Sequence, residues 1–422
     1  MYKKTLLHNG LRIVSHCMPA MQSVALGIWI KVGGRYESER NKGISHFLEH
    51  LLFKGSKKFS YRKLKESIEG VGGSLNGFTL EESTCYLAKI PSRYLGIAWD
   101  VLADMVLNPL LPTQEVEKER TVILEEIKMY KDQPQVYVYD LLDELLWPGQ
   151  PLGAPIIGTM DSVAQVKKED ILSFKEQFYT PVNMVISAAG QLKHDKLVRL
   201  TEKTFTRVKA GFSNNFVKAK ENQKTPSLKI FHKETEQTHM ALGFHSFKRE
   251  HPLRHALGIL NIVLGANMSS RLFNEVREKR GLAYEIGTLV KRYLDTGVFL
   301  VHAGIDNAKL QEAVSLILGQ LKICKKELIG KDEFKRAKEF YLGQLLLALE
   351  DTLDHMVWIG ETMTCLDRSY TLNEIIKEVD KVDREDVRQT ARAIFQERKL
   401  NMALIGPLQD SQPNIQKGLR ID

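Results

Sequence analysis

Apolar runs alternate with amphipathic stretches along the 422 residues of the chain. Six of these runs are short, either apolar throughout or alternating, and typical of strands; they cover residues 23–32, 84–90, 184–189, 240–244, 298–302 and 401–405. Stretches with helical spacing separate them, but strands and helices do not follow one another in a strict βαβ order. The pattern predicts an α+β fold with mainly antiparallel sheets covered by helices.

The two halves of the chain look like copies of one unit. ISHFLEHLLFKG precedes LKESIEGVGGSLNGFT in the first half, and RHALGILNIVLG precedes LFNEVREKRGLAYEIGT in the second. Each half closes with a charged amphipathic stretch that runs into an apolar one, VKKEDILSFKEQFYTPVNMVISAAG and VDREDVRQTARAIFQERKLNMALIG. Two similarities in the same order indicate a duplication. We therefore expect two homologous α/β-sandwich domains, at residues 1–208 and 226–422, joined by the polar linker 209–225.

The motif HFLEH at residues 46–50 carries the candidate chemistry. It lies in a predicted helix over residues 41–54, in which the leucines fall on one face while His46, Glu49 and His50 share the other, at about 100° per residue. Two imidazoles one turn apart can bind one metal ion, and a glutamate between them can take a proton from water. A pair of histidines alone would equally suit a solvated helix face, but the full HxxEH pattern favours a hydrolytic zinc site.

Such a site needs a third protein ligand and one open position. Residues 113–131 predict a strong helix, with acidic residues in its first turns and lysines in its last. Glu119 and Glu126 flank the apolar face of this helix, whereas Glu125 points to solvent. Helical phase therefore favours Glu126 over Glu125 as the third ligand and leaves Glu119 to support a ligand from behind.

The second copy of the unit has lost the motif. When the halves are aligned through Gly55 and Gly265, the corresponding residues of the second copy are apolar: Ala256, Ile259 and Leu260 take the places of His46, Glu49 and His50. One copy is therefore expected to carry the chemistry, and the other to serve a different purpose.

Composition limits location and partners. Hydrophobic residues make up 43% and charged residues 27%, as in soluble globular proteins. No apolar run reaches about eighteen residues, so no membrane-spanning helix and no membrane partner are expected. The opening MYKKTLLHNGLRIVSH is typical of a strand, a turn and a strand rather than a signal peptide, and the four cysteines are scattered, so we expect a cytoplasmic protein. The net charge of +8 is dispersed without a nucleic-acid-binding motif, which predicts no nucleic-acid partner.

The chain resembles the pitrilysin family of inverzincin metallopeptidases, in particular the branch of the mitochondrial processing peptidase and its short bacterial relatives. The similarity covers nearly the whole chain and is carried by LHNGLRIV, HFLEHLLFKG, GGSLNGFT, ERTVILEEIKMYKDQP and MSSRLFNEVREKRGLAYEIG. An HxxEH motif followed by a glutamate 76 residues later is typical of this family. The resemblance implies a zinc endopeptidase that holds one Zn²⁺ per chain through His46, His50 and Glu126, with Glu49 as general base and Glu119 supporting the site.

The resemblance also implies roles outside this motif. Family members have an arginine and a tyrosine, seven residues apart, that reach the substrate from a catalytically silent domain, and these match Arg277 and Tyr284. Tyr284 would donate a hydrogen bond to the oxyanion, and Arg277 would bind a substrate carbonyl or carboxylate. GGSLNGFT matches the edge strand to which substrate is added as a further strand, with Asn76 as a substrate contact. The alternatives are ordinary packing for the arginine and tyrosine and a plain glycine turn before a strand.

Single-chain members of the family have four such domains, arranged as two bowls around a chamber for extended, unfolded peptides. This chain has two domains, or half of such a clam shell. The resemblance therefore implies a homodimer in which Arg277 and Tyr284 serve the metal site of the other protomer. Two alternatives remain: a non-catalytic structural or interaction subunit with the same fold, and a catalytic subunit that requires a different partner chain.

Overall fold

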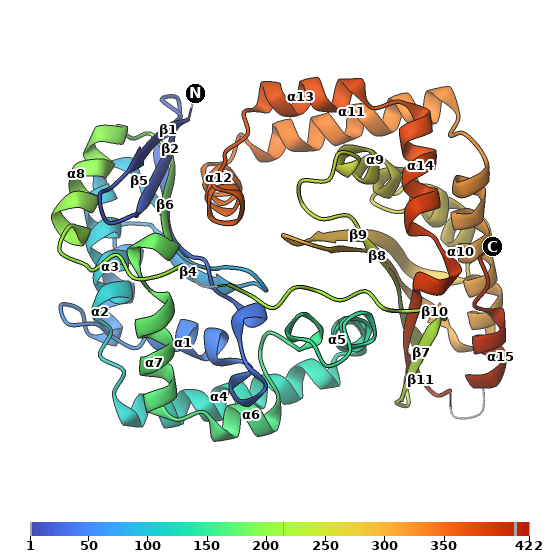
Figure 1. Ribbon diagram of the computed structural model, residues 1–422, viewed down its shortest axis with the longest axis horizontal. Helices are drawn as coiled ribbons and strands as arrows, with labels where there is room; N and C mark the ends of the chain where they lie inside the picture. The colour runs from blue at the N-terminus through green and yellow to red at the C-terminus, as the bar shows by residue number, and fades with distance from the viewer. Residues whose placement is uncertain (1, 214, 409–411, 422) are drawn as a thin grey trace. The chain divides into compact units, whose positions relative to one another are not determined.

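The computed structural model describes residues 2–213, 215–408 and 412–421. These residues form two compact units, each built around one β-sheet with helices on both faces (Figure 1). The first unit consists of Met1–Lys128, Ala154–Val217 and Leu346–Leu372, and the second of Met129–Gly153, Lys218–Leu345 and Asn373–Asp422. Two mainly antiparallel sheets covered by helices confirm the predicted fold class.

The first sheet has six strands in the order β1-β2-β6-β3-β5-β4. Every neighbouring pair is antiparallel except β2 and β6, which run parallel. β4 is an edge strand, because β5 is its single strand neighbour in this sheet. The strands are β1 (Lys3–Leu6), β2 (Arg12–Cys17), β3 (Ser23–Ile30), β4 (Ser74–Thr79), β5 (Thr84–Pro91) and β6 (Met184–Gly190).

The second sheet has five strands in the order β7-β11-β8-β10-β9, again with one parallel pair, β7 and β11. Strand for strand, this order repeats β2-β6-β3-β5-β4 of the first sheet, which supports the duplication inferred from the sequence. The strands are β7 (Ser227–His232), β8 (Gln237–Ser246), β9 (Ala283–Arg292), β10 (Gly297–Asp306) and β11 (Leu400–Gly406). No helix or strand lies between Phe205 and Ser227 among the described residues, the stretch that contains the predicted linker.

Local sequence explains the strands that were predicted. β3 reads SVALGIWI and is buried on both faces because helices cover both sides of the sheet, so it shows no polar alternation. The turn between β1 and β2 is the predicted Asn-Gly turn. Gly10 adopts φ +86°, and the Asn9 amide donates a hydrogen bond to the Phe205 carbonyl at 2.8 Å.

Helices account for most of the remaining chain. In the part of the chain that the structure describes, no helix is both long and apolar enough to cross a bilayer. The helices are α1 (Ile44–Leu52), α2 (Tyr61–Glu69), α3 (Leu95–Leu107), α4 (Thr113–Asp132), α5 (Pro134–Leu146), α6 (Met160–Gln165), α7 (Lys168–Phe178), α8 (His194–Phe205), α9 (Arg254–Leu264), η6 (Phe273–Glu278), α10 (Leu310–Lys326), α11 (Lys331–Ala348), α12 (Thr352–Leu366), α13 (Leu372–Lys381), α14 (Arg384–Ile394) and α15 (Gln412–Gly418).

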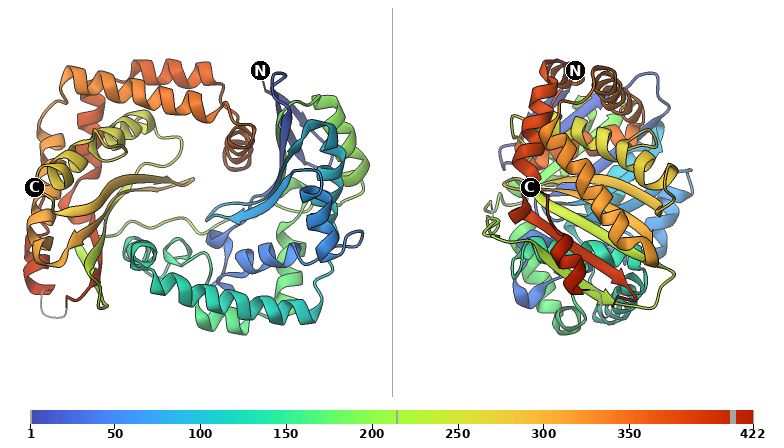
Figure 2. Two further views of the ribbon diagram at one scale, coloured as in Figure 1. Left: turned by 180° about the vertical axis from the view of Figure 1, so that it is seen from behind. Right: turned by 90° about the vertical axis from the view of Figure 1, so that its right-hand side faces the viewer.

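Each unit takes one helix from the other half of the sequence. α12 packs on β6, β3 and β2 of the first sheet, and α5 packs on β11 and β8 of the second (Figures 1 and 2). Met356 of α12 lies in the buried cluster around Trp29, and Leu142 of α5 lies in the cluster with Val298 and Ala403. The compact units therefore interleave along the chain, instead of following it as two continuous halves, because each sheet buries one of its faces under the exchanged helix.

Candidate metal centre

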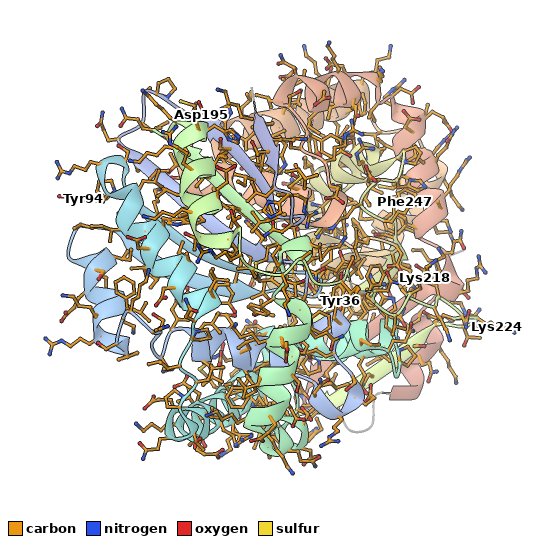
Figure 3. All side chains as sticks on the ribbon, turned by 60° about the vertical axis from the view of Figure 1, so that its left-hand side comes forward. Tyr36, Tyr94, Asp195, Lys218, Lys224 and Phe247 are labelled. Carbon is orange, nitrogen blue, oxygen red and sulfur yellow. The ribbon has the colours of Figure 1, made fainter. Side chains whose placement is uncertain are left out.

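The turn that leads into α1 is fixed by aromatic and charged contacts. Tyr36, labelled in Figure 3, packs edge-on against Phe178 and Phe216. The next residue, Glu37, is buried and accepts hydrogen bonds from the Gly43 and Ser45 backbone N–H groups at 2.7 and 2.8 Å. These bonds satisfy donors at the first turn of the helix. Burial raises the pKa of Glu37 to about 7, although both bonds favour the ionised form.

α1 is amphipathic in the sense expected from its sequence. Its buried apolar side chains are Ile44, Phe47, Leu48, Leu51 and Leu52. His46 and His50 are half-buried on the other side of the helix, with ring centroids 4.5 Å apart. Since one turn separates them, both imidazoles face the same space.

α4 brings a carboxylate to this pair. His46, His50 and Glu126 each offer a ligand atom, and these three atoms lie within 4.8 Å of one another. His50 Nε2 is 3.8 Å from Glu126 Oε2. Within the described residues, no other set of three or more His, Cys, Asp and Glu side chains comes together this closely. Glu125, in contrast, has 64% of its side chain exposed and pairs with Lys128.

The surroundings of the two histidines shift their pKa values in opposite directions. Burial, followed by the proximity of His50, lowers the pKa of His46 to about 3, so this ring is neutral near pH 7. Its Nδ1 is buried and has no hydrogen-bond partner among the described residues. Burial also disfavours a charge on His50, but the hydrogen bond to Glu119 and the nearby carboxylates outweigh it and raise the pKa of His50. Two imidazoles and one carboxylate, one of the rings with an unpaired buried nitrogen, fit the three-ligand set of a hydrolytic zinc site.

Glu119 lies behind His50, on the side away from Glu126. Its Oε2 is 3.2 Å from His50 Nδ1, and its Oε1 is 2.5 Å from Lys54 Nζ. Burial would raise the pKa of Glu119, but the bonds to His50 and Lys54 overcome it, so the net shift is downward. Glu119 is therefore an ionised acceptor that orients the imidazole.

Glu49 stands between the two histidines in sequence and next to the edge strand in space. It is 8% exposed, and its Oε2 accepts a hydrogen bond from the Thr79 hydroxyl at 2.7 Å. A side chain at Gly77 would place its Cβ 3.2 Å from Glu49 Oε1, so the glycine keeps this oxygen accessible. Burial is the largest influence on Glu49 and raises its pKa, which favours a group that accepts and returns a proton.

Asn76 lies on the same edge strand but on its other face. Strand residues alternate between the two faces of a sheet, so Gly77 and Thr79 face α1 while Asn76 shares the opposite face with Phe78. The ring centroid of Phe78 lies 5.5 Å from that of Trp29. The Asn76 side chain is exposed and accepts from its neighbour's N–H at 2.8 Å.

Arg277 and Tyr284 lie together in the second unit. Arg277 is on η6 and Tyr284 is the second residue of β9, and the guanidinium carbon is 5.6 Å from the tyrosine ring centroid. The same guanidinium carbon lies 4.7 Å from the ring centroid of Phe273. Tyr284 is 75% exposed, so it has little role in the core of this unit.

Thr79 and Lys54 are the site residues that sequence reasoning missed. Both lie within segments that carry the family resemblance, Thr79 in GGSLNGFT and Lys54 in HFLEHLLFKG. Their positions relative to the motif residues could therefore have pointed to them. Thr79 is two residues from Gly77 and thus on its face of the strand, and Lys54 is one turn after His50. Their partners, however, come from other elements.

Comparison with known proteins places the chain in a family. It matches two family models, Insulinase (Peptidase family M16) over residues 12–160 and Peptidase M16 inactive domain over residues 165–341. It is 38% identical over 408 residues to the uncharacterized zinc protease YmxG of Bacillus subtilis, covering 96% of this chain and 98% of the relative. The chain belongs to peptidase family M16. This confirms the predicted resemblance to the pitrilysin family, and to its short-chain members in particular.

Other M16 comparisons agree. An uncharacterized zinc protease of Rickettsia felis is 35% identical over 405 residues, which is 95% of this chain and 96% of that protein. The crystal structure of a protease from Helicobacter pylori superposes with a TM-score of 0.90 at 24% identity, covering 96% of this chain and all of that one. An M16 inactive-domain structure from Pseudomonas fluorescens gives 0.89 at 16% identity, with coverages of 96% and 98%. At these identities, the two structures show that the M16 fold is shared.

Proposed function

We propose that this M16 protein is a zinc-dependent endopeptidase that hydrolyses extended, unfolded peptides. The observation that carries the proposal is the convergence of His46, His50 and Glu126 within 4.8 Å, beside a buried Glu49 that is not part of the ligand set. The zinc protease names of relatives at 38% and 35% identity support the same chemistry.

His46, His50 and Glu126 would hold one zinc ion per chain. When bound, zinc supplies Lewis-acid chemistry, lowering the pKa of water and polarising a carbonyl group. Glu49 accepts the proton that water loses as its oxygen attacks the scissile carbonyl carbon. It then gives that proton to the amide nitrogen as the C–N bond breaks, so the products are a carboxylic acid and an amine. Because the Thr79 hydroxyl occupies Oε2 of Glu49, Oε1 is the oxygen left for this proton transfer.

The preference for extended peptides rests on β4. This strand ends the first sheet, and its residues Gly77 and Thr79 face Glu49. A peptide that adds to the free edge as another strand would run past the metal site with its backbone hydrogen-bonded along its length. A folded substrate cannot supply a free strand of this kind, so short flexible peptides are the expected substrates. Asn76, exposed on the same strand, is proposed as a substrate contact.

Arg277 and Tyr284 are proposed to complete the site from another protomer of a homodimer. Their side chains lie together and Tyr284 is largely exposed, as residues that meet a substrate must be. Tyr284 would donate to the oxyanion of the tetrahedral intermediate, and Arg277 would bind a substrate carbonyl or carboxylate. The two protomers would enclose a chamber for the peptide, and the protein is proposed to act in the cytoplasm.

The test is metal content together with peptide hydrolysis by the purified single chain. We expect about one zinc per chain, loss of hydrolysis on chelation, and recovery when zinc is returned. Glu49→Gln should keep zinc and fold but lose turnover by at least about 10²-fold, since the proton acceptor is removed. Near-normal turnover by Glu49→Gln would overturn the mechanism. A chain that binds zinc but cuts nothing alone would point to a different partner chain, and one that binds no zinc to a non-catalytic subunit.

A further inference from the structure

Glu119 uses its two carboxylate oxygens on different partners. Oε2 accepts from His50 Nδ1 at 3.2 Å, and Oε1 lies 2.5 Å from Lys54 Nζ. The Glu119 side chain is only 6% exposed and that of Lys54 is 20% exposed. A buried carboxylate that had lost one of its partners would remain poorly solvated and free to rotate. The contact with Lys54 therefore fixes the rotation of the Glu119 carboxylate that faces His50.

Lys54 is itself held in place. It follows His50 by four residues and lies two residues beyond the end of α1 at Leu52. The Lys54 N–H donates to the Leu51 carbonyl at 3.0 Å, and Gly55, at φ +124°, ends the turn. The Tyr61 ring centroid lies 5.3 Å from Nζ and covers one side of the ammonium group. A cation just beyond the end of a helix is also favoured by the helix dipole.

The bond between Glu119 and Nδ1 of His50 also affects Nε2, the ring nitrogen on the side of the ligand cluster. An Nδ1 that donates to a carboxylate carries the ring proton, which leaves the lone pair on Nε2. Nε2 is the atom that lies 3.8 Å from Glu126 Oε2, on the side of the ligand cluster. The path from Lys54 through Glu119 thus sets both the tautomer and the orientation of the His50 ring.

The second copy of the unit shows that the fold does not need this lysine. Alignment through Gly55 and Gly265 places Leu264 at the position of Lys54, and Leu264 is fully buried. Matching the first residues of α4 and α11 places the buried Ala337 opposite Glu119. The lysine and its glutamate are absent from the copy that also lacks the histidines.

We propose that Lys54 is a positioning residue of the metal site, which acts through Glu119 to hold the His50 ring ready for zinc. This inference rests on the proposed zinc function. An ordinary exposed ion pair at this place would contribute little and would leave metal affinity unchanged. Metal affinity is therefore the measurement that separates the two roles.

The experiment measures the zinc dissociation constant of the full chain by competition with a chromophoric chelator. Lys54→Met keeps the length of the side chain but removes its charge and donors, and should weaken zinc binding about tenfold, the low end of the range for residues that orient ligands. Lys54→Arg keeps a cation that can reach Glu119 and should stay within about threefold of the wild type. Lys57→Met is the matched control, because Lys57 is exposed and lies three residues further on. Thermal unfolding of the metal-free variants checks that each is folded, and Lys54→Gln replaces Lys54→Met if the latter does not fold.

Combining Lys54→Met with Glu119→Gln tests the path. If Lys54 acts through Glu119, the double variant should bind zinc no more weakly than Glu119→Gln alone. A folded Lys54→Met chain with wild-type zinc affinity overturns the inference, as does a full further tenfold loss in the double variant. Both results leave the proposed function standing. A wild-type chain that binds no zinc overturns the proposed function, and this inference with it.

Discussion

The Thr79 hydroxyl lies 2.7 Å from Oε2 of Glu49, and the two residues come from the edge strand and the metal-site helix. The strand proposed to receive the substrate is therefore bonded directly to the proposed general base. This contact fixes the rotation of the carboxylate about its last torsion and directs Oε1 towards the space beside Gly77.

Removing this hydroxyl should slow turnover without removing the metal. Thr79→Val keeps the shape of the side chain, and we expect kcat to fall about tenfold to hundredfold, because a hydrogen bond to a charged group contributes about 1.5–3 kcal/mol. Thr79→Ser retains the hydroxyl and serves as the control. Steady-state kinetics with a fluorogenic peptide and zinc analysis of each variant make the measurement. Equal kcat for Thr79→Val and the wild type would show that the bond does not position the base.

The third ligand can be tested with two adjacent glutamates. Glu126→Gln should weaken zinc binding by more than about hundredfold, because a neutral amide replaces an anionic ligand and the effect should exceed the 10–100-fold typical of residues behind the ligands. Glu125→Gln makes the same change in charge at a side chain that is 64% exposed and paired with Lys128. It should leave zinc affinity unchanged. Chelator competition measures both, and unchanged affinity in Glu126→Gln would remove this ligand from the site.

A shared active site can be tested by complementation. A Glu49→Gln chain and an Arg277→Ala/Tyr284→Ala chain should each be nearly inactive. In a mixed dimer, one site would combine the intact metal centre of one chain with the intact arginine and tyrosine of the other. Hydrolysis should therefore return towards the level of one good site per mixed dimer. Subunit exchange without recovery, followed with two affinity tags, would exclude the shared arrangement, and an active monomer in sedimentation would exclude the dimer.

The packing of α12 on the first sheet should depend on pH. His16 of β2 stacks on His355 of α12 with ring centroids 4.3 Å apart and planes inclined by 6°. Burial, followed by the proximity of His355, lowers the pKa of His16 from 6.5 to about 4. The unfolded state therefore binds this proton more tightly than the folded state. The free energy of unfolding should accordingly fall as pH drops from about 6.5 to about 4.

His16→Phe keeps an aromatic ring in the stack and removes the titrating group. Its melting temperature should fall less than that of the wild type over this pH range. Circular dichroism of metal-free protein between pH 4 and 7 measures the difference, because protonation of the metal ligands would otherwise release zinc within the same pH range. Parallel pH profiles for the two proteins would contradict the prediction.

The sequence by itself determined the parts of this protein that depend on local spacing. Apolar runs located β3, β5, β6, β8, β10 and β11, and the Asn-Gly turn marked the reversal between β1 and β2. The helix predicted over residues 41–54 is shorter, Ile44–Leu52. A helical period of 3.6 residues was sufficient to place His46, Glu49 and His50 on one face, and to favour Glu126 over Glu125. Those inferences rest on the fixed relative directions of neighbours along one helix or strand, whatever the rest of the chain does.

Tertiary structure alone decided which residues from other elements contact the faces of these helices and strands. No local pattern shows that Thr79 reaches Glu49, since β4 must first pair with β5 at the edge of the sheet. Nor does spacing show that Lys54, just beyond α1, bonds to Glu119, which follows it by 65 residues and lies on α4. The sequence also did not predict that α5 packs on the second sheet and α12 on the first. The pattern of an amphipathic helix specifies which face is buried but not the sheet against which that face packs.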